Sequence, residues 1–263
     1  MSETFLGKII AKTRDTVERQ KKETDLAALK RRATEARAYA IPRRLRSALS
    51  RTDRTNIIAE IKRASPSRGV INADVDVAAL ARQYEAGGAA AISVLTEEEY
   101  FGGSLDELRA VRAAVDLPIL RKDFTVDEFQ IYEAAEAGAD AILLIVAALT
   151  EAELKGFLRL AQDDLGMDAL VEVHGREELA VAKRLGAGII GVNNRDLHSL
   201  EVSLDVSRSL ITNRPENALM VAESGITTRD EIVELKHLGF DGFLIGETLM
   251  RTENATETLG TWI

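Results

Sequence analysis

The chain has 263 residues, 46% of them hydrophobic, and a formal net charge of −9 at pH 7. It contains no cysteine, which excludes disulfides, thiolate nucleophiles and cysteine-bound zinc. Its apolar runs fall well short of the roughly 20 residues of a membrane span, and no apolar signal core follows the N-terminal charges, so a cytoplasmic protein without membrane contact is expected.

Charge is distributed unevenly along the chain. Residues 1–50 carry 13 lysines and arginines against 6 aspartates and glutamates, whereas the remaining 213 residues carry 21 against 37. A basic arm can bind nucleic acid, but aromatic side chains do not interleave with the basic ones here. The favoured interpretation is that residues 1–50 are a helical extension packed on an acidic body, with no nucleic-acid partner.

Two helices are predicted in this extension. The first has one apolar stripe, which consists of Leu6, Ile9, Ile10, Thr13 and Val17. The second covers residues 26–38. We expect both helices to lie across one end of the body, with Pro42 marking the passage toward the first strand.

From Asn56 onward, eight short apolar runs alternate with amphipathic helical stretches. The runs begin near Ile57, Ala90, Pro118, Ala141, Asp168, Gly188, Ala218 and Gly242. Their spacing of roughly 26 residues is that of one strand–loop–helix unit. Eight such units without a break predict an α/β fold, a (β/α)8 TIM barrel with extra N-terminal helices, as a single domain over residues 1–263.

An internal repeat supports the barrel. Four similar segments, separated by about two units, begin at Gly88, Gly138, Gly186 and Gly239. Each glycine follows a predicted helix, where it can adopt the left-handed conformation that turns the chain into the next strand.

Strand side chains alternate between the barrel interior and the helix layer, and barrel active sites lie at the C-terminal strand ends. In residues 56–62 one face is wholly apolar and suits the helix layer. Glu60 and Lys62 lie on the other face, so they are predicted to point inward.

The same alternation brings more polar side chains to the barrel mouth. The inward residues expected from the third, fifth, sixth and seventh runs are Lys122, Glu172, Asn193 and Ser224, the last sharing its face with Met220 and Ala222. Burying several ionisable groups together is costly unless pairing or a ligand offsets it, and such clusters favour catalysis.

Two loops are predicted to bind phosphate. Gly225 follows the seventh run and Gly246 the eighth, and glycines there free backbone N–H groups to face an anion, as is usual in barrels. Thr228 and Glu231 have the spacing of a capping box for the next helix.

Five segments resemble motifs of the indole-3-glycerol-phosphate synthase family. They are EIKRASPS (60–67), LTEEEYFGGS (95–104), PILRKDF (118–124), NNRDL (193–197) and AESGI (222–226). The resemblance spans nearly the whole chain. Glu247 departs from the small residue of many relatives, so only its backbone N–H is expected to contact phosphate.

The resemblance implies a carboxy-lyase of tryptophan biosynthesis. Such an enzyme converts 1-(2-carboxyphenylamino)-1-deoxyribulose 5-phosphate to indole-3-glycerol phosphate, releasing carbon dioxide and water, and requires no cofactor. Its partner is a phosphorylated small molecule. A monomer is expected, and association with other tryptophan-pathway enzymes stays open.

Roles at the site follow from the resemblance. Lys122 is the leading general acid for ring closure, and Lys62 lies near the substrate carboxylate and can share proton transfer. Glu172 is the acid–base partner in dehydration, and Glu60 orients Lys62 and binds the substrate. The two lysines are expected to lower each other's pKa, and their division of labour stays open.

The other implied contacts surround these groups. Asn193 and Ser224 would hydrogen-bond the reacting groups, and Ser65 and Arg195 would help to hold the substrate. The residues expected against the aromatic ring are Phe101, Phe124 and Leu143. The three histidines, His174, His198 and His237, are too scattered for a metal site and are interpreted as surface or supporting residues.

Two alternatives remain. One is a barrel lyase or aldolase that forms a Schiff base between Lys122 or Lys62 and a phosphorylated sugar. The other is a non-catalytic barrel that only binds a phosphorylated ligand. The isomerase one step earlier in the pathway is disfavoured, because its base is usually a cysteine on the first strand and this chain contains no cysteine.

Overall fold

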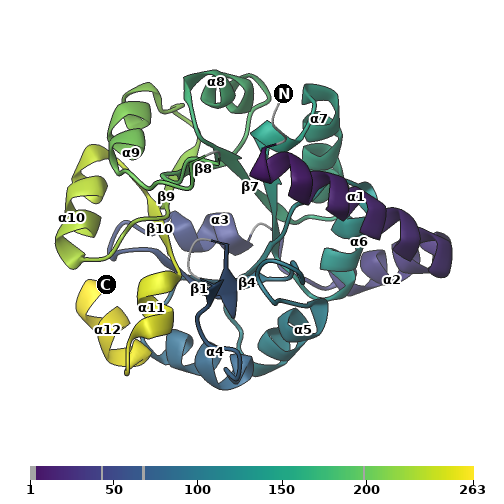
Figure 1. Cartoon of the computed structure of the whole chain (residues 1–263), viewed down its shortest axis with the longest axis horizontal. Coiled ribbons are helices and arrows are strands. Elements are labelled where there is room, and N and C mark those ends of the chain that lie inside the picture. Colours follow the sequence, from purple (N-terminus) through teal and green to yellow (C-terminus); the bar gives the residue numbers. More distant parts are fainter. Residues whose placement is uncertain (1–3, 43, 67–68, 198) are drawn as a thin grey trace.

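The computed structural model describes residues 4–42, 44–66, 69–197 and 199–263. Eight parallel strands close a barrel in the order β1-β10-β9-β8-β7-β6-β5-β4 (Figure 1). They are β1 (Ile57–Ile61), β4 (Ala91–Leu95), β5 (Ile119–Lys122), β6 (Ala141–Ile145), β7 (Asp168–Val173), β8 (Ile189–Asn193), β9 (Leu219–Glu223) and β10 (Gly242–Ile245). Each begins within one residue of its predicted start. The predicted barrel is confirmed.

Helices surround the barrel in Figure 1. Those that follow the strands are α4 (Val77–Ala86), α5 (Leu105–Ala114), α6 (Glu128–Glu136), α7 (Glu151–Arg159), α8 (Arg176–Arg184), α9 (Asp205–Leu210), α10 (Arg229–Leu238), α11 (Glu247–Arg251) and α12 (Ala255–Trp262). Shorter pieces are the antiparallel pair β2 (Ala64–Ser65) and β3 (Gly69–Val70), the 3-10 helices η1 (Val146–Ala148) and η3 (Ile211–Asn213), and the π-helical segment η2 (Leu160–Asp164). Within the described ranges, no helix is long and apolar enough to span a bilayer.

Two apolar layers follow the predicted alternation in most strands. Ile57, Ala59 and Ile61 lie in the layer between strands and helices. Ile58 belongs to the separate cluster that fills the barrel interior. The same division places Leu120 and Leu170 inside, so the prediction of inward faces is confirmed for β1, β5 and β7.

In β9 the predicted alternation is wrong. Val221 lies in the interior cluster, and Met220 and Ala222 pack against the helices. The strand ends at Glu223, and Ser224 has already turned into the left-handed region with φ +64°. Counting back by twos from Ser224 therefore gives each residue of β9 the wrong face. The inward side chain is Glu223.

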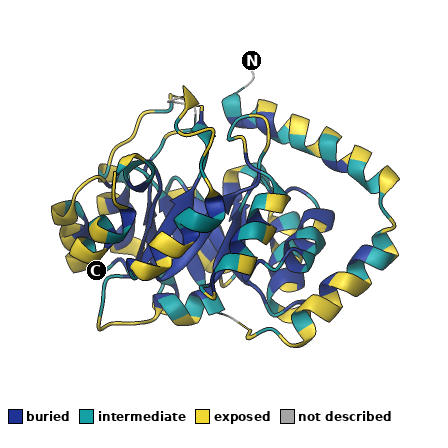
Figure 2. Ribbon diagram, turned by 90° about the horizontal axis from the view of Figure 1, so that it is seen from below, coloured by how far each residue is buried: buried dark blue, intermediate teal, exposed yellow. Residues whose placement is uncertain are grey.

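The extension contains three helices, α1 (Phe5–Glu23), α2 (Leu26–Ala38) and α3 (Arg44–Leu49). In Figure 2, α1 runs over one end of the barrel and the chain then descends along its side. The expectation that α2 also lies across an end is wrong, because it packs against α6.

The opposite end is closed by α3, which was not predicted. Its Leu45 and Leu49 are fully buried in the interior cluster, and Asp168 Oδ2 accepts a hydrogen bond from the Arg46 backbone N–H at 2.9 Å. Burial of these two leucines stabilises a helix that is too short to form alone.

Ion pairs explain the uneven charge. Lys21 contacts Asp127 at 2.9 Å, Lys30 contacts Glu128 at 2.8 Å and Arg32 contacts Glu136 at 2.9 Å. In each pair a base of the extension meets an acid in or just before α6. The basic segment therefore lies against the acidic outer face of the barrel.

Two predicted local structures are confirmed. The four repeat glycines, with Gly138 at φ +90° as one example, all have left-handed backbones. Thr228 caps α10 in a complete capping box with Glu231. Both features fix where helices stop and start, and so they fix the loops that lead into and out of the strands.

Candidate active site

A cavity of about 900 Å³ opens at the C-terminal ends of the strands. It is lined by every residue that was predicted to belong to a site, namely Glu60, Lys62, Ser65, Phe101, Lys122, Phe124, Leu143, Glu172, Asn193, Arg195, Ser224, Gly225, Gly246 and Glu247. Helix α1 contributes Phe5, Leu6 and Ile9 to the wall. Residues from the whole length of the chain therefore meet in one chamber.

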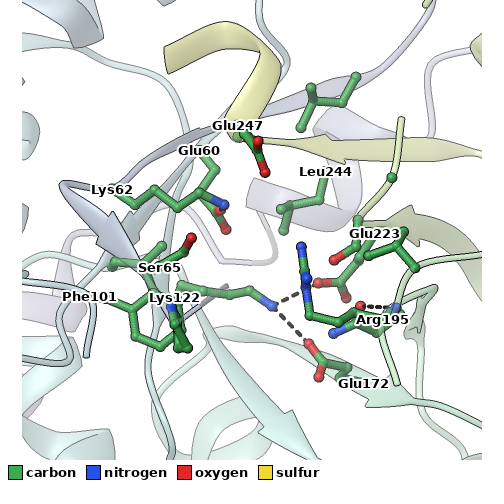
Figure 3. Close-up of a pocket in the computed structure, with 18 of the residues that line it drawn as sticks. Glu60, Lys62, Ser65, Phe101, Lys122, Glu172, Arg195, Glu223, Leu244 and Glu247 are labelled. Atoms are coloured by element: carbon green, nitrogen blue, oxygen red, sulfur yellow. Dashed lines mark hydrogen bonds and ion pairs between the residues drawn. The ribbon is translucent and has the colours of Figure 1, made fainter. Parts of the chain in front are cut away.

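Lys122 occupies the centre of this chamber (Figure 3). Its Nζ lies 2.8 Å from Glu172 Oε2 and 2.7 Å from Glu223 Oε2. The three side chains are only 12%, 3% and 2% exposed. One ammonium group thus bridges two buried carboxylates contributed by β7 and β9.

Glu223 is a site residue that was not predicted from the sequence. Its Oε1 is buried and has no hydrogen-bond partner among the described residues, although its Oε2 holds Lys122. A signal was present in the sequence: a carboxylate without a nearby basic residue is costly to bury in the helix layer at the end of an apolar strand. That reasoning places Glu223 inward and makes Met220 and Ala222 the outward residues.

A second ion pair lies across the cavity. Lys62 Nζ donates to Glu60 Oε1 at 2.7 Å, and Figure 3 shows both side chains on the side opposite Glu172 and Glu223. Gly246 makes room for this pair, because a Cβ there would come within 2.5 Å of Glu60 Oε1 and 3.0 Å of Lys62 Nζ. Gly246 therefore has a steric role beside the pair.

Gly191 makes room for Glu223 in the same way, because a Cβ on Gly191 would overlap Glu223 Oε1. We expect Gly191→Ala to displace this carboxylate and Lys122 with it, lowering kcat about 100-fold, since small misplacements of reacting groups are costly. Steady-state kinetics would check this. Gly156→Ala is the matched control, because nothing lies within 4 Å of its added methyl. Equal kcat in the two variants would contradict the steric role.

The buried carboxylates control the charge of Lys122. Burial opposes the ammonium form, but the negative charges of Glu172, Glu223 and Glu60 outweigh it and raise the pKa of Lys122 above its usual range. The expectation that the two lysines lower each other's pKa is thus wrong for Lys122, because its near neighbours are acids. In the ligand-free site Lys122 is therefore a cation that donates hydrogen bonds to two carboxylates.

The two carboxylates differ. Burial would raise the pKa of Glu172, but Lys122 and His174 outweigh it and hold that pKa below its usual range. Burial wins at Glu223, where the neighbouring Glu172 adds to it and Lys122 compensates only in part, so the pKa of Glu223 rises to about 7. One lysine cannot fully stabilise two buried anions, so burial favours the protonated form of Glu223 over that of Glu172.

The histidines take different positions. His174 Nε2 lies 3.3 Å from Glu172 Oε1, and its Nδ1 lies 3.3 Å from Glu178 Oε2. His237 Nδ1 contacts the Val233 carbonyl on an exposed face of α10. The prediction for His198 falls outside the described residues. In the described part of the chain, no group of three or more acids and histidines is arranged to hold a metal ion.

Polar and aromatic side chains complete the wall. Ser65 Oγ is buried with no hydrogen-bond partner in the described part of the chain, so it can bind a ligand. Asn193 Oδ1 accepts from the Arg195 backbone N–H at 3.0 Å, and Arg195 Nη1 donates to a loop carbonyl. The rings of Phe101 and Phe124 lie 6.3 Å apart and form an apolar surface. Leu143 extends that surface.

A buried network supports the segment that carries Lys122 and Phe124. Arg121 donates to Asp123 Oδ2 at 3.0 Å and to Thr96 Oγ1 at 3.0 Å, and Thr96 donates to the same carboxylate at 2.5 Å. Arg121 and Thr96 do not line the cavity, whereas Asp123 does, and their hydrogen bonds fix the end of β5.

The loops after β9 and β10 form the other end of the chamber. Ser224 and Gly225 both have left-handed backbones, with φ +64° and +81°. Thr248 Oγ1 donates to the Ile226 carbonyl at 3.0 Å and joins the two loops. Glu231 already occupies the backbone N–H groups at the start of α10. Gly225, Gly246 and Glu247 of these loops line the cavity.

Comparisons with known proteins agree on one family. The family profile described as "Indole-3-glycerol phosphate synthase" matches residues 6–261. A protein of that name from Lachnoclostridium phytofermentans is 46% identical over 260 residues, covering 95% of each chain. Another, from Carboxydothermus hydrogenoformans, is 45% identical and covers 97% of this chain and 98% of the relative.

Solved structures add the fold alone. A thiamine phosphate pyrophosphorylase from Pyrococcus furiosus superposes with a TM-score of 0.60 at 18% identity, covering 83% of this chain and 95% of that chain. The sequence matches carry the assignment, because they extend over nearly the full length of both partners. The chain belongs to the indole-3-glycerol phosphate synthase family.

Proposed function

We propose that this chamber converts 1-(2-carboxyphenylamino)-1-deoxyribulose 5-phosphate to indole-3-glycerol phosphate, with release of carbon dioxide and water. Family membership makes the chain an indole-3-glycerol phosphate synthase, a carbon–carbon lyase of tryptophan biosynthesis. The observation that carries the residue assignment is Lys122 between Glu172 and Glu223 on the floor of the cavity. Turnover is tested by the appearance of indole absorbance and fluorescence from this substrate.

The substrate has an anion at each end, and the chamber has a matching group for each. The phosphate would lie on the backbone N–H groups of Gly225 and Glu247. The Glu247 carboxylate lies 3.6 Å from Arg251 Nη2, which compensates its negative charge. At the other end Lys62 would hold the benzoate, and the ring would pack on Phe101 and its apolar neighbours. Holding both ends brings the reacting carbons together.

Ring closure begins when the aromatic carbon that bears the carboxylate attacks the ketone carbon. Lys122 donates its proton to the ketone oxygen as the new carbon–carbon bond forms, so no alkoxide accumulates. The carboxylate then leaves as carbon dioxide, and the electron pair of its bond restores the aromatic ring. Lys122 is left as a neutral amine.

Dehydration follows in the same chamber. Glu172 would protonate the departing hydroxyl, which leaves as water, and the neutral Lys122 would take the proton from the adjacent carbon. The loss of that proton forms the double bond of the indole and restores the ammonium group. Glu223, bonded to Lys122, would keep its amine in position through both transfers. This scheme makes Lys122 an acid first and a base second.

Arg195, Asn193, Ser65 and Ser224 would hydrogen-bond the sugar part and the reacting groups. For the finer properties of the protein, we propose a cytoplasmic monomer that binds a phosphorylated small molecule, which its place in amino-acid biosynthesis supports. Association with other tryptophan-pathway enzymes stays a hypothesis. Analytical ultracentrifugation of the purified chain tests the monomer, and a larger species at micromolar concentration would refute it.

The Schiff-base alternative makes a different demand on Lys122. A nucleophilic amine must be neutral, whereas here two carboxylates keep the group charged. We therefore expect borohydride, added during turnover, to leave the protein mass unchanged. A mass increase equal to the reduced substrate adduct would support the alternative instead.

A further inference from the structure

The proposed function implies that the reaction consumes one proton from solvent in each turnover. The substrate carboxylate leaves as neutral carbon dioxide, so the products carry one negative charge fewer than the substrate. In the proposed scheme Lys122 regains its proton at the end, whereas Glu172 gives one away with the departing water. Glu172 must therefore be protonated again in each turnover. The need for this proton rests on the proposed function.

The mouth of the cavity is a poor route for a proton from solvent to Glu172. Its side chain is 3% exposed, Lys122 covers one oxygen at 2.8 Å, and bound substrate would occupy the cavity above it. The other oxygen, Oε1, lies 3.3 Å from His174 Nε2. Nε2 is buried and makes no hydrogen bond with the described residues, so this contact is an ion pair, and a small turn of the ring would align Nε2 with Oε1. This second oxygen is the one on the side away from the bridging lysine.

His174 connects that oxygen to the outside. Its side chain is 13% exposed, and Nδ1 lies 3.3 Å from Glu178 Oε2, whose side chain is 26% exposed on the first turn of α8. Glu178 also accepts the His174 backbone N–H at 2.7 Å, which fixes the two residues together. An imidazole can accept a proton at one nitrogen and release one from the other.

The charges around His174 favour transfer of a proton from its ring to Glu172 after Lys122 has lost its own proton. Burial alone would lower the pKa of His174, but Glu172 and Glu178 outweigh it and raise that pKa to about 10. His174 therefore waits as a cation. Once Lys122 has given up its proton, one of the charges that kept Glu172 ionised is gone while its burial remains, so Glu172 gains affinity for a proton. Glu172 in turn contacts Lys122 of β5, which also contacts Glu223 of β9.

We propose that His174 is a positioning residue that passes a proton from solvent to Glu172, with Glu178 as its outer partner. The N–H bond at Nε2 breaks as the O–H bond at Glu172 Oε1 forms. Nδ1 keeps its proton, which points toward Glu178. The ring then turns, and Nε2 takes up a new proton from water. Atoms and charge balance, since one solvent proton enters for each water that carries one away.

The decisive variant is His174→Asn, which keeps a hydrogen-bonding side chain but cannot relay a proton. We expect kcat to fall roughly 100-fold, the low end of what acid–base residues contribute, with KM within about twofold. The solvent deuterium isotope effect on kcat should increase, and added imidazole should restore part of the rate. His237→Asn, which removes an exposed histidine of α10, is the matched control and should behave as the wild type.

Glu178→Gln gives a second test on a more exposed side chain. It should lower kcat several-fold and move the pH at which kcat declines downward, because the cation at His174 loses one of its two acids. A His174→Asn enzyme with wild-type kcat, or with a loss that imidazole does not relieve, would overturn the relay. If the wild-type chain itself forms no indole, the proposed function fails. Wild-type turnover with an inert His174 substitution defeats the relay alone.

Discussion

Lys122→Ala is expected to lower kcat by roughly 10³- to 10⁴-fold, the upper part of the range for acid–base groups. The loss should be this large because the same amine serves as acid in ring closure and as base in dehydration. The substitution also leaves Glu172 and Glu223 without their shared cation at 2.8 and 2.7 Å. Both carboxylates should then take up protons more readily, since burial raises the pKa of each and the opposing charge is gone.

Removal of one partner from a buried ion pair also destabilises the fold, by about 3–5 kcal/mol where the remaining charge persists. Turnover should therefore be measured beside urea unfolding and beside binding of the product by fluorescence titration. We expect binding within about tenfold of wild type, because Lys62 and the loops at Gly225 and Gly246 hold the ends of the ligand. Lys155→Ala, on the exposed face of α7, is the control. A Lys122→Ala enzyme that folds, binds product and keeps a tenth of wild-type kcat would contradict the assignment.

Glu172→Gln is expected to separate the two halves of the reaction. The amide preserves the shape of the side chain and can still accept a hydrogen bond from Lys122, but it cannot donate a proton to the departing hydroxyl. We expect steady-state indole formation to fall roughly 10²- to 10³-fold. Ring closure and decarboxylation should be affected far less, because Lys122 performs them.

A single-turnover experiment with excess enzyme resolves these steps. Carbon dioxide should appear in a burst equal to the bound substrate, while indole fluorescence lags far behind. Glu177→Gln, an exposed neighbour on α8, should show no such separation. If carbon dioxide and indole slow by the same factor, Glu172 acts before decarboxylation and the proposed order is wrong.

Much of this site could be predicted from alternation along single strands. Lys62 lies one residue beyond β1 and still lines the cavity, as the count predicts. Glu60, Lys122 and Glu172 lie within regular strands. Counting by twos is reliable under that condition. It failed in β9 because Ser224 lies beyond the last regular residue, at φ +64°. When the count starts from a residue in a turn, every residue of the strand is assigned to the wrong face.

Other features depend on contacts between distant segments, which no local pattern contains. Helix α3 is six residues long and forms because Leu45 and Leu49 close the bottom of the barrel. The position of α2 depends on its packing against α6, which the sequence of α2 alone does not indicate. The pKa of Lys122 rises or falls according to which charge lies nearest, and only the structure shows that Glu172 and Glu223 lie closest. Spacing along the chain does not contain that distance.

The central claim is that one buried lysine between two glutamates drives ring closure, decarboxylation and dehydration in this barrel. The most direct test is to incubate the purified wild-type chain with 1-(2-carboxyphenylamino)-1-deoxyribulose 5-phosphate, without added metal or cofactor, and to record carbon dioxide and indole-3-glycerol phosphate together. We predict continuous turnover with one molecule of each product per substrate consumed. Saturable binding of the substrate with release of neither product would contradict the account and would leave a barrel that only binds a phosphorylated ligand.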